Sequence, residues 1–280
     1  MPTTQYGLRG AAGGGEPIRT ALLLAAGMGS RLAPFTDDMP KCLVPVSGVP
    51  IIERLVRTLD DYGFERLVAV VGHQAGSVRD FLGDRFGGVA VEYVVSPLFA
   101  TTNSLYSLWL ARHLVDGPFL LVESDVVFDA PLLVPLLQPD RVAVSAQLPW
   151  MSGTTVTLDA CGRVSAFSSP PPGVYGRHCR AADHFITVNL TSLARDTWAE
   201  ARERLDRHVA AGHTGYFHDV VFAEMTAAGS MSLEAVVYPT DRWYEVDTPV
   251  DRDAAELVFP RRLQAAGGSG RPALSGRRRP

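Results

Sequence analysis

Short apolar runs alternate with amphipathic stretches from residue 18 to residue 148. Apolar runs between turn signals predict strands, and apolar residues at helical spacing predict helices. In order, we expect a strand at 20–27, a helix at 50–63, a strand at 66–72, a helix at 75–83, a strand at 89–96, a helix at 102–114, a strand at 118–124, a short helix at 130–137 and a strand at 141–148. Near-continuous apolar strands separated by helices are typical of a mostly parallel sheet covered on both faces. The fold class predicted is therefore α/β with a doubly wound sheet.

The regular alternation loosens after residue 149. Residues 154–169 predict a β-hairpin that is inserted into this order and turns at 159–162. The further elements expected are a strand at 183–191 that returns to the sheet, a helix capped by Ser192 and ended by Gly212, a helix at 217–227, strands at 233–239 and 243–247, and a helix at 249–257. We also expect Asp129 to cap the helix at 130–137.

The two ends of the chain differ in composition from its middle. Residues 1–16 are rich in glycine and polar residues, and residues 263–280 combine Gly, Ser and Pro with an arginine run at 277–279. Segments of this kind bury little apolar surface, so both are predicted to be disordered extensions. For the arginine run we favour a solvated tail over a binding site for an acidic partner.

Composition excludes several classes of function. The net charge of −4 gives no positive field for nucleic acid or an anionic membrane, so any anion must be bound locally. The three cysteines, Cys42, Cys161 and Cys179, are too far apart in sequence for a C-x-x-C pair, which argues against a zinc site or a disulfide framework. No apolar run is long enough to span a membrane. We therefore expect a cytoplasmic, soluble protein, and the oligomeric state stays open between monomer and homodimer.

The first strand ends in a glycine turn followed by two basic residues. Ligands of doubly wound sheets bind at the carboxyl ends of the strands. Glycines at that place let backbone N–H groups approach phosphate oxygens, while Arg31 offers a forked donor and Lys41 a point charge. A dinucleotide fingerprint is disfavoured by Leu32 at its third small position, and the G-K-[ST] of a Walker loop is absent. The pattern predicts a local site for a phosphate group.

The full motif, L-A-A-G-x-G-x-R-L followed by P-K, resembles the nucleotidyltransferases that activate sugar phosphates and related phosphorylated alcohols. "VPVSGVPIIE" after it is also similar to that family. The resemblance implies a Rossmann-like nucleotidyltransferase fold over 17–262, with a nucleotide-binding half at 17–148 and an acceptor-binding half at 149–262. It implies nucleotide contacts at Leu24, Ala25, Ala26, Gly27, Met28, Gly29, Arg31 and Asn103.

In such an enzyme a phosphate monoester attacks the α-phosphorus of a nucleoside triphosphate, and pyrophosphate leaves. The attacking phosphate is already mostly dianionic at pH 7, so cations rather than a general base must do the catalysis. The resemblance assigns this role to Arg31, Lys41 and Mg²⁺. It places Asp125, just past the strand at 118–124, and Asp247 as the metal ligands.

Two of these assignments have a plain structural alternative. Asp247 could cap the helix that begins at 249, but Glu245 lies two residues before it on a predicted strand, so both carboxylates project from one face. We favour the metal role because such acid pairs are unusual on a buried strand. For Asn103, capping of the helix at 102–114 and contact with the nucleotide weigh equally.

Residues 96–111 resemble the phosphocholine and phosphonate cytidylyltransferase branch. The resemblance implies CTP as the donor and a small phosphate or phosphonate as the acceptor. Acceptor-binding candidates are Glu245, Asn189, Asp219 and Tyr244, together with an aromatic lining from Trp150, Tyr216, Phe217 and Trp243 that core packing would explain equally well. Two alternatives stay open: a sugar-1-phosphate nucleotidyltransferase that uses UTP or dTTP, and a non-catalytic nucleotide-binding regulator of the same fold.

Overall fold

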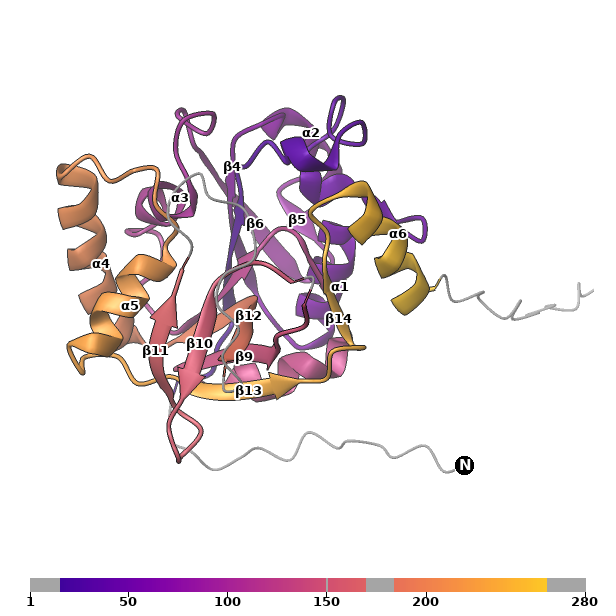
Figure 1. Cartoon of the computed structure of the whole chain (residues 1–280). Helices are drawn as coiled ribbons and strands as arrows, with labels where there is room; N and C mark the ends of the chain where they lie inside the picture. The colour runs from indigo at the N-terminus through magenta and orange to yellow at the C-terminus, as the bar shows by residue number, and fades with distance from the viewer. Residues whose placement is uncertain (1–15, 150, 170–183, 261–280) are drawn as a thin grey trace, which may run out of the picture.

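Four parallel strands form the centre of the molecule. A computed structural model describes residues 16–149, 151–169 and 184–260 (Figure 1). The central strands lie in the order β7 (Phe119–Glu123), β1 (Thr20–Ala25), β4 (Arg66–Val71) and β6 (Val89–Val95), and β5 (Arg85–Phe86) adds an antiparallel edge. All four central strands fall within the ranges predicted from the apolar runs.

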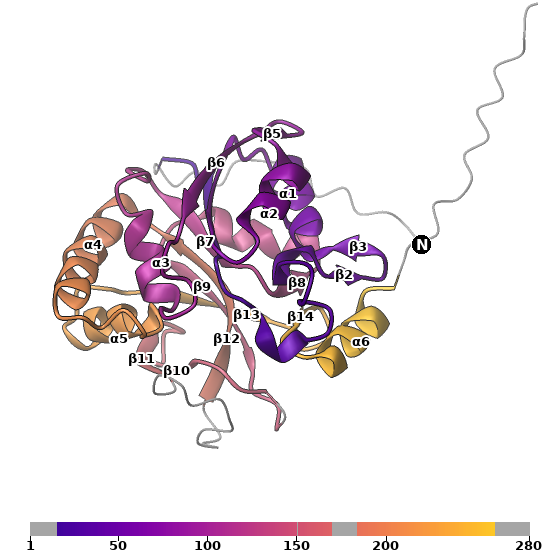
Figure 2. The ribbon, with the colours of Figure 1, turned by 90° about the horizontal axis from the view of Figure 1, so that it is seen from above.

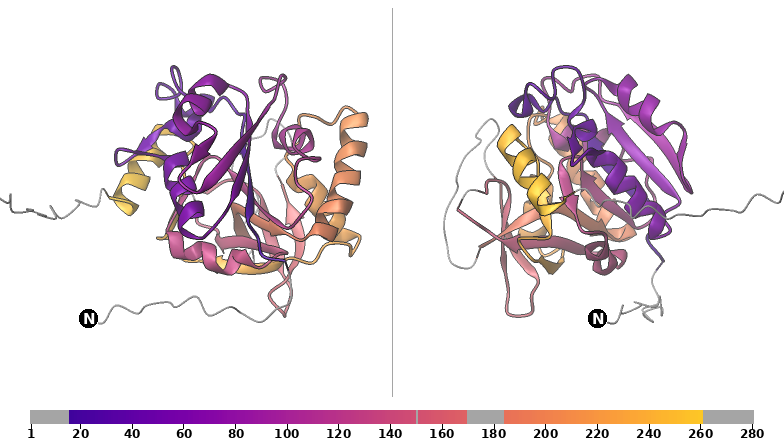
Figure 3. Two further views of the ribbon diagram at one scale, coloured as in Figure 1. Left: turned by 180° about the vertical axis from the view of Figure 1, so that it is seen from behind. Right: turned by 90° about the vertical axis from the view of Figure 1, so that its right-hand side faces the viewer.

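Helices cover both faces of this sheet. Alternate residues of β1 enter different hydrophobic clusters: Leu23 packs with α1 (Ile51–Asp61) and α2 (Ala75–Leu82), whereas Leu22 packs with α3, α4 and α5. These three helices span Ser104–Leu110, Arg195–Ala210 and Asp219–Ala227. Figures 1 and 3 show α4 and α5 across the sheet from α1. The doubly wound α/β class is confirmed.

The second half of the chain joins the same sheet with mixed strand directions. The long β12 (His184–Leu193) pairs antiparallel with β7, with β9 (Arg141–Ala146) and with β10 (Thr155–Leu158). β10 and β11 (Val164–Ser168) form the predicted hairpin, and β13 (Glu234–Tyr238) runs parallel to β9. β9 runs in the same direction as the four central strands, and the antiparallel β12 lies between them.

Three local predictions need correction. Ser192 does not cap a helix: it lies in β12 and its hydroxyl donates to the Gln138 carbonyl, while α4 begins three residues later. Asp129 precedes a 3-10 helix (Ala130–Leu137) without capping it, because its carboxylate accepts from Arg242 Nε at 2.7 Å. The helix predicted at 102–114 is shorter, since its α-helical part is α3 alone.

A small third cluster ties the amino-terminal loop to the carboxyl-terminal helix. Two short 3-10 helices (Ser30–Leu32 and Lys41–Leu43) and the ribbon of β2 (Pro45–Val46) and β3 (Val49–Pro50) lie near β8 (Val126–Phe128), β14 (Trp243–Glu245) and α6 (Pro249–Val258). The buried members of this cluster are Leu32, Val44, Val46, Ile51, Val127, Val246, Ala255 and Phe259. Figure 2 shows the indigo loop after β1 beside β14 and α6. Residues distant in sequence are thereby brought to one place.

Some predictions concern residues that the structure does not describe. Apart from Glu16, the two predicted terminal extensions lie outside the described residues, as do Trp150, Cys179 and residues 261 and 262. Cys42 and Cys161 have free thiols. Within the described residues, no helix has both the length and the apolar character needed to cross a lipid bilayer.

Candidate active site

The carboxyl ends of β1 and β7 open into a cleft of about 370 Å³. The two strands are parallel neighbours in which Leu24 lies opposite Glu123, so the turns that follow both strands meet at one edge of the sheet. The sequence candidates that line this cleft are Leu24, Ala26, Gly27, Met28, Gly29, Arg31, Lys41, Asn103, Asp125, Glu245 and Asp247. A second cavity of about 240 Å³ adjoins it and shares Arg31, Glu245 and Asp247.

The two basic side chains contact the two aspartates directly. Lys41 Nζ lies 2.8 Å from Asp125 Oδ2 and 2.5 Å from Asp247 Oδ1. Arg31 Nη2 lies 2.8 Å from Asp247 Oδ2. Lys41 is 12% exposed and Arg31 is 43% exposed, so the ammonium is enclosed while the guanidinium stands at the mouth. Residues 31, 41, 125 and 247 therefore share one cleft.

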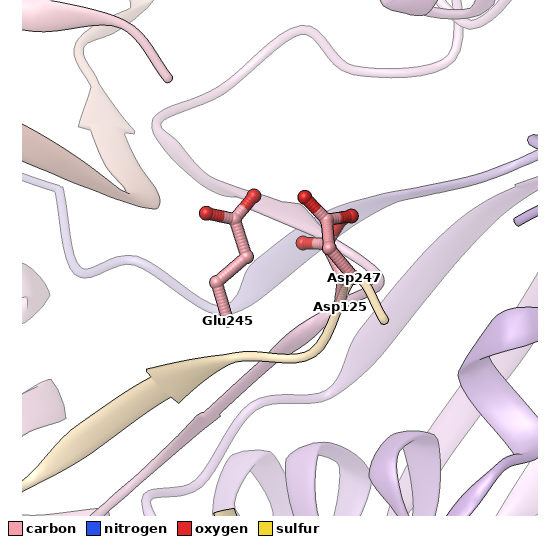
Figure 4. Close-up of side chains that lie close together, drawn as sticks. All are labelled: Asp125, Glu245 and Asp247. Carbon is pink, nitrogen blue, oxygen red and sulfur yellow. The ribbon is translucent and has the colours of Figure 1, made fainter. Parts of the chain in front are cut away.

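Three carboxylates face one another at the base of this cleft. β14 pairs antiparallel with β8 so that Glu245 lies opposite Val126, and the Val246 N–H donates to the Asp125 carbonyl at 2.9 Å. This pairing brings ligand atoms of Asp125, Glu245 and Asp247 within 4.8 Å of one another (Figure 4). Hard carboxylate oxygens in such a group suit Mg²⁺. The sequence suggested Glu245 as an acceptor-binding residue, but its carboxylate lies among the candidate metal ligands.

Asn189 braces two of these carboxylates. It sits where the register of β12 against β9 shifts, and its φ of 59° is left-handed, a conformation that asparagine tolerates better than most residues. Its Nδ2 donates to Asp125 Oδ1 at 3.3 Å and to Glu245 Oε1 at 3.2 Å. Asn189 therefore positions the Asp125 and Glu245 carboxylates, whereas the sequence suggested that it contacts the acceptor substrate.

The pKa values at the site are shifted because several buried acids lie around few cations. Burial alone would lower the pKa of Lys41, but the attraction of Asp125, Asp247 and Glu245 outweighs it and the pKa lies above its usual value. Burial would raise the pKa of Asp247, yet Lys41 and Arg31 bring it below its usual value. Burial, followed by repulsion from Asp247 and Asp125, raises the pKa of Glu245 well above normal. An additional cation would stabilise this set of acids, as expected of a metal site.

The two glycines of the turn differ in what requires them. Gly29 has a φ of +62°, and a Cβ there would lie 2.9 Å from Lys41 Cβ. A Cβ on Gly27 would have no atom within 4 Å other than those of its chain neighbours. Gly29 is thus needed for the packing of Lys41, while the open space at Gly27 faces the cleft.

Four remaining candidates lie less centrally. Ala25 packs in the core under α1 and lines neither cavity, so only its backbone is available to a ligand there. Asn103 lines the cleft and caps α3, since its Oδ1 accepts from the Ser104 N–H at 2.8 Å. Asp219 is buried and lines neither cavity, and its carboxylate accepts from Thr154 Oγ1 at 2.8 Å. Tyr244 lines the second cavity.

The aromatic candidates are divided among different environments. Phe217 lines the cleft and Trp243 the second cavity, whereas Tyr216 stacks on His213 and lines neither. Phe99 and Glu123 also line the cleft, and neither is among the site residues predicted from the sequence. Glu123 lies two residues before Asp125, and this spacing alone could have placed it near the same edge. Nothing in the local sequence marks Phe99.

Comparison with known proteins assigns the family. A model described as the MobA-like NTP transferase domain matches residues 21–181, more than half of the chain. The chain belongs to this family. The resemblance to nucleotidyltransferases inferred from the glycine turn and its two cations is confirmed. The matched range contains Arg31, Lys41 and Asp125 but ends before Asp247.

Individual relatives of this MobA-like NTP transferase domain extend the comparison. The CMP-5'-(3-aminopropyl)phosphonate synthase of Streptomyces rubellomurinus is 36% identical over 260 residues, 89% of this chain and 40% of that protein. The UTP–glucose-1-phosphate uridylyltransferase of Haloferax volcanii is 35% identical over 112 residues, 40% of this chain and 45% of that protein. The chain thus spans less than half the length of either curated relative.

A solved structure shares the fold. The CTP:phosphocholine cytidylyltransferase from Streptococcus pneumoniae superimposes with a TM-score of 0.72 at 19% identity, over 86% of this chain and 100% of that one. At this identity the likeness concerns the fold alone.

Proposed function

We propose that this protein is a Mg²⁺-dependent cytidylyltransferase that transfers CMP from CTP to a small phosphate or phosphonate and releases pyrophosphate. The observation that carries the proposal is the meeting of Arg31 and Lys41 with Asp125, Glu245 and Asp247 in one cleft beside the glycine turn. CTP and a phosphonate acceptor are supported by the Streptomyces relative, whose name states a CMP-phosphonate product.

The proposed reaction needs charge neutralisation above all. An oxygen of the acceptor dianion attacks the α-phosphorus of CTP, a new P–O bond forms, the bond to the β-phosphate oxygen breaks, and pyrophosphate leaves with its electron pair. No proton has to be removed from the attacking group. Arg31 and Lys41 offset the charge of the phosphates, and backbone groups from Leu24 to Gly27 with the Asn103 side chain orient the nucleotide.

The acid group would hold the metal. Asp125, Glu245 and Asp247 supply oxygen ligands of the kind Mg²⁺ prefers, and the bound ion would neutralise charge on the transferring phosphoryl group. The acceptor would lie toward the second cavity, beside Trp243 and Tyr244. We propose 17–148 as the nucleotide-binding half and 149–262 as the acceptor-binding half, with one sheet running through both.

A pyrophosphate-release assay tests this function. CTP, UTP, dTTP, ATP and GTP are each paired with phosphocholine, phosphoethanolamine, 3-aminopropylphosphonate and glucose 1-phosphate. We expect release with CTP and a phosphonate or phosphoalcohol, and loss of turnover by at least about 100-fold in Asp125→Asn. Asp253→Asn, an exposed acid on α6, is the matched control and should retain full rate.

The main alternative is a sugar-1-phosphate nucleotidyltransferase, which the Haloferax relative favours over 40% of the chain. Turnover of glucose 1-phosphate with UTP or dTTP, and none with CTP, would decide for it. Nucleotide binding without turnover of any pair would instead indicate a regulator of the same fold.

A further inference from the structure

Lys41 occupies the place between the carboxylates where a divalent ion would bind. Its ammonium contacts Asp125 Oδ2 at 2.8 Å and Asp247 Oδ1 at 2.5 Å. These two residues and Glu245 form the group whose ligand atoms lie within 4.8 Å of one another. Magnesium takes oxygen ligands at about 2.0–2.1 Å. An ion bound by both aspartates would therefore compete with the ammonium for the oxygens that Lys41 now holds.

In each aspartate, the carboxylate oxygen that Lys41 does not contact is held by a different neighbour. Asp125 Oδ1 accepts from Asn189 Nδ2 at 3.3 Å, and Asp247 Oδ2 accepts from Arg31 Nη2 at 2.8 Å. Asn189 also reaches Glu245 Oε1 at 3.2 Å, so one amide braces two of the three acids. If Lys41 withdraws, Asp125 and Asp247 keep their orientation and offer the vacated oxygens to another cation.

The choice of lysine at this position is unusual for this chain. Lys41 is the only lysine among 280 residues, and all other members of the 26 lysine and arginine positions are arginine. An ammonium is a compact, strongly hydrated point charge, whereas a guanidinium is a flat fork with fixed donor directions. Of the two, the ammonium is the better substitute for a small spherical ion among converging carboxylates.

We propose that Lys41 fills the metal position in the nucleotide-free protein, and that the arriving divalent ion displaces its ammonium toward the phosphates of the nucleotide. Metal and nucleotide then bind with positive coupling, because the ion frees a cation for the phosphates and the phosphates give that cation a new partner. The second half of this exchange rests on the proposed function. The first half, ammonium for metal, concerns the protein and the ion alone.

The single lysine makes the displacement directly observable. Protein labelled with ¹³C at the ε-carbon of lysine should give one lysine resonance that needs no further assignment. Titration with MgCl₂ in the absence of nucleotide should shift this resonance along the same saturation curve that calorimetry records for metal binding. A resonance that stays in place while the ion binds would overturn the proposal.

Metal affinity in variants provides the second test. Mn²⁺ binding is measured by electron paramagnetic resonance without nucleotide, after circular dichroism has verified folding. Lys41→Met should tighten Mn²⁺ binding by at least about fivefold, because the competing cation is gone. Arg31→Met also removes one positive charge, but Arg31 contacts Asp247 Oδ2, which Lys41 does not hold. This variant should therefore tighten Mn²⁺ binding less. Equal tightening in both variants, or no Mn²⁺ binding in either wild type or Lys41→Met, would contradict displacement.

The two proposals fail in different ways. Movement of the lysine resonance with no turnover of CTP would refute the cytidylyltransferase and leave the exchange intact. Turnover of CTP with a lysine resonance that ignores bound Mg²⁺ would do the opposite.

Discussion

Gly29 lies where the chain leaves β1 and turns toward the basic side chains. A side chain there meets two obstacles, a left-handed φ of +62° and the Cβ of Lys41 at 2.9 Å. We expect Gly29→Ala to lower the free energy of unfolding by about 1–2 kcal/mol through the backbone conformation. It should also lower turnover by more than tenfold, since a displacement of about 1 Å in a catalytic group can cost on the order of 100-fold.

Gly162 separates these two effects. It has a similar φ of +77° at the turn between β10 and β11, and a Cβ there would meet nothing within 4 Å. Gly162→Ala should therefore lose a similar amount of stability in urea unfolding while the pyrophosphate assay shows wild-type turnover. If Gly29→Ala behaves like Gly162→Ala in both measurements, the packing of Gly29 on Lys41 has no catalytic importance.

The start of α6 holds the loop that carries Asp247. Thr248 Oγ1 accepts from the Asp251 N–H, and the Asp251 carboxylate accepts from the Thr248 N–H, which is a capping box. Thr248→Ala should lower the free energy of unfolding by about 1 kcal/mol. Thr248→Ser keeps the hydroxyl and should restore most of that loss. Urea titrations of the three proteins measure this, and an unaltered midpoint in Thr248→Ala would show that the cap is dispensable.

Elements near the site differ in how far local sequence predicts them. The apolar runs predict β1 and β7, and the rule for parallel sheets then predicts that Gly27 and Asp125 follow strands that end at one edge. The register shift that gives Asn189 a left-handed backbone depends on how β12 meets β9, and β9 lies some forty residues earlier in the chain. Ser192 illustrates the same limit, because a long-range strand pairing overrides a plausible local cap.

The whole molecule is acidic, and its candidate anion site is assembled from distant parts of the chain. A net charge of −4 provides no general attraction for an anionic ligand, and the two cations near the amino end are held in place by acids from the middle and the carboxyl end. The apolar cluster around Leu32, Val246 and Phe259 packs these distant segments together. The residue types at the site could be predicted from the sequence, but their ion pairing across the chain depends on the tertiary packing.

The same charge balance makes a divalent ion indispensable to the proposed reaction. Two basic side chains face three carboxylates before any substrate enters, and a triphosphate and a phosphonate dianion add still more negative charge. Excess EDTA should therefore reduce pyrophosphate release from CTP to background, and added Mg²⁺ should restore it. Circular dichroism should be unchanged by EDTA, because apolar contacts hold the surrounding elements together. Full turnover in excess chelator would refute the metal requirement, whereas unfolding by EDTA would mean that the ion supports the fold as well as the chemistry.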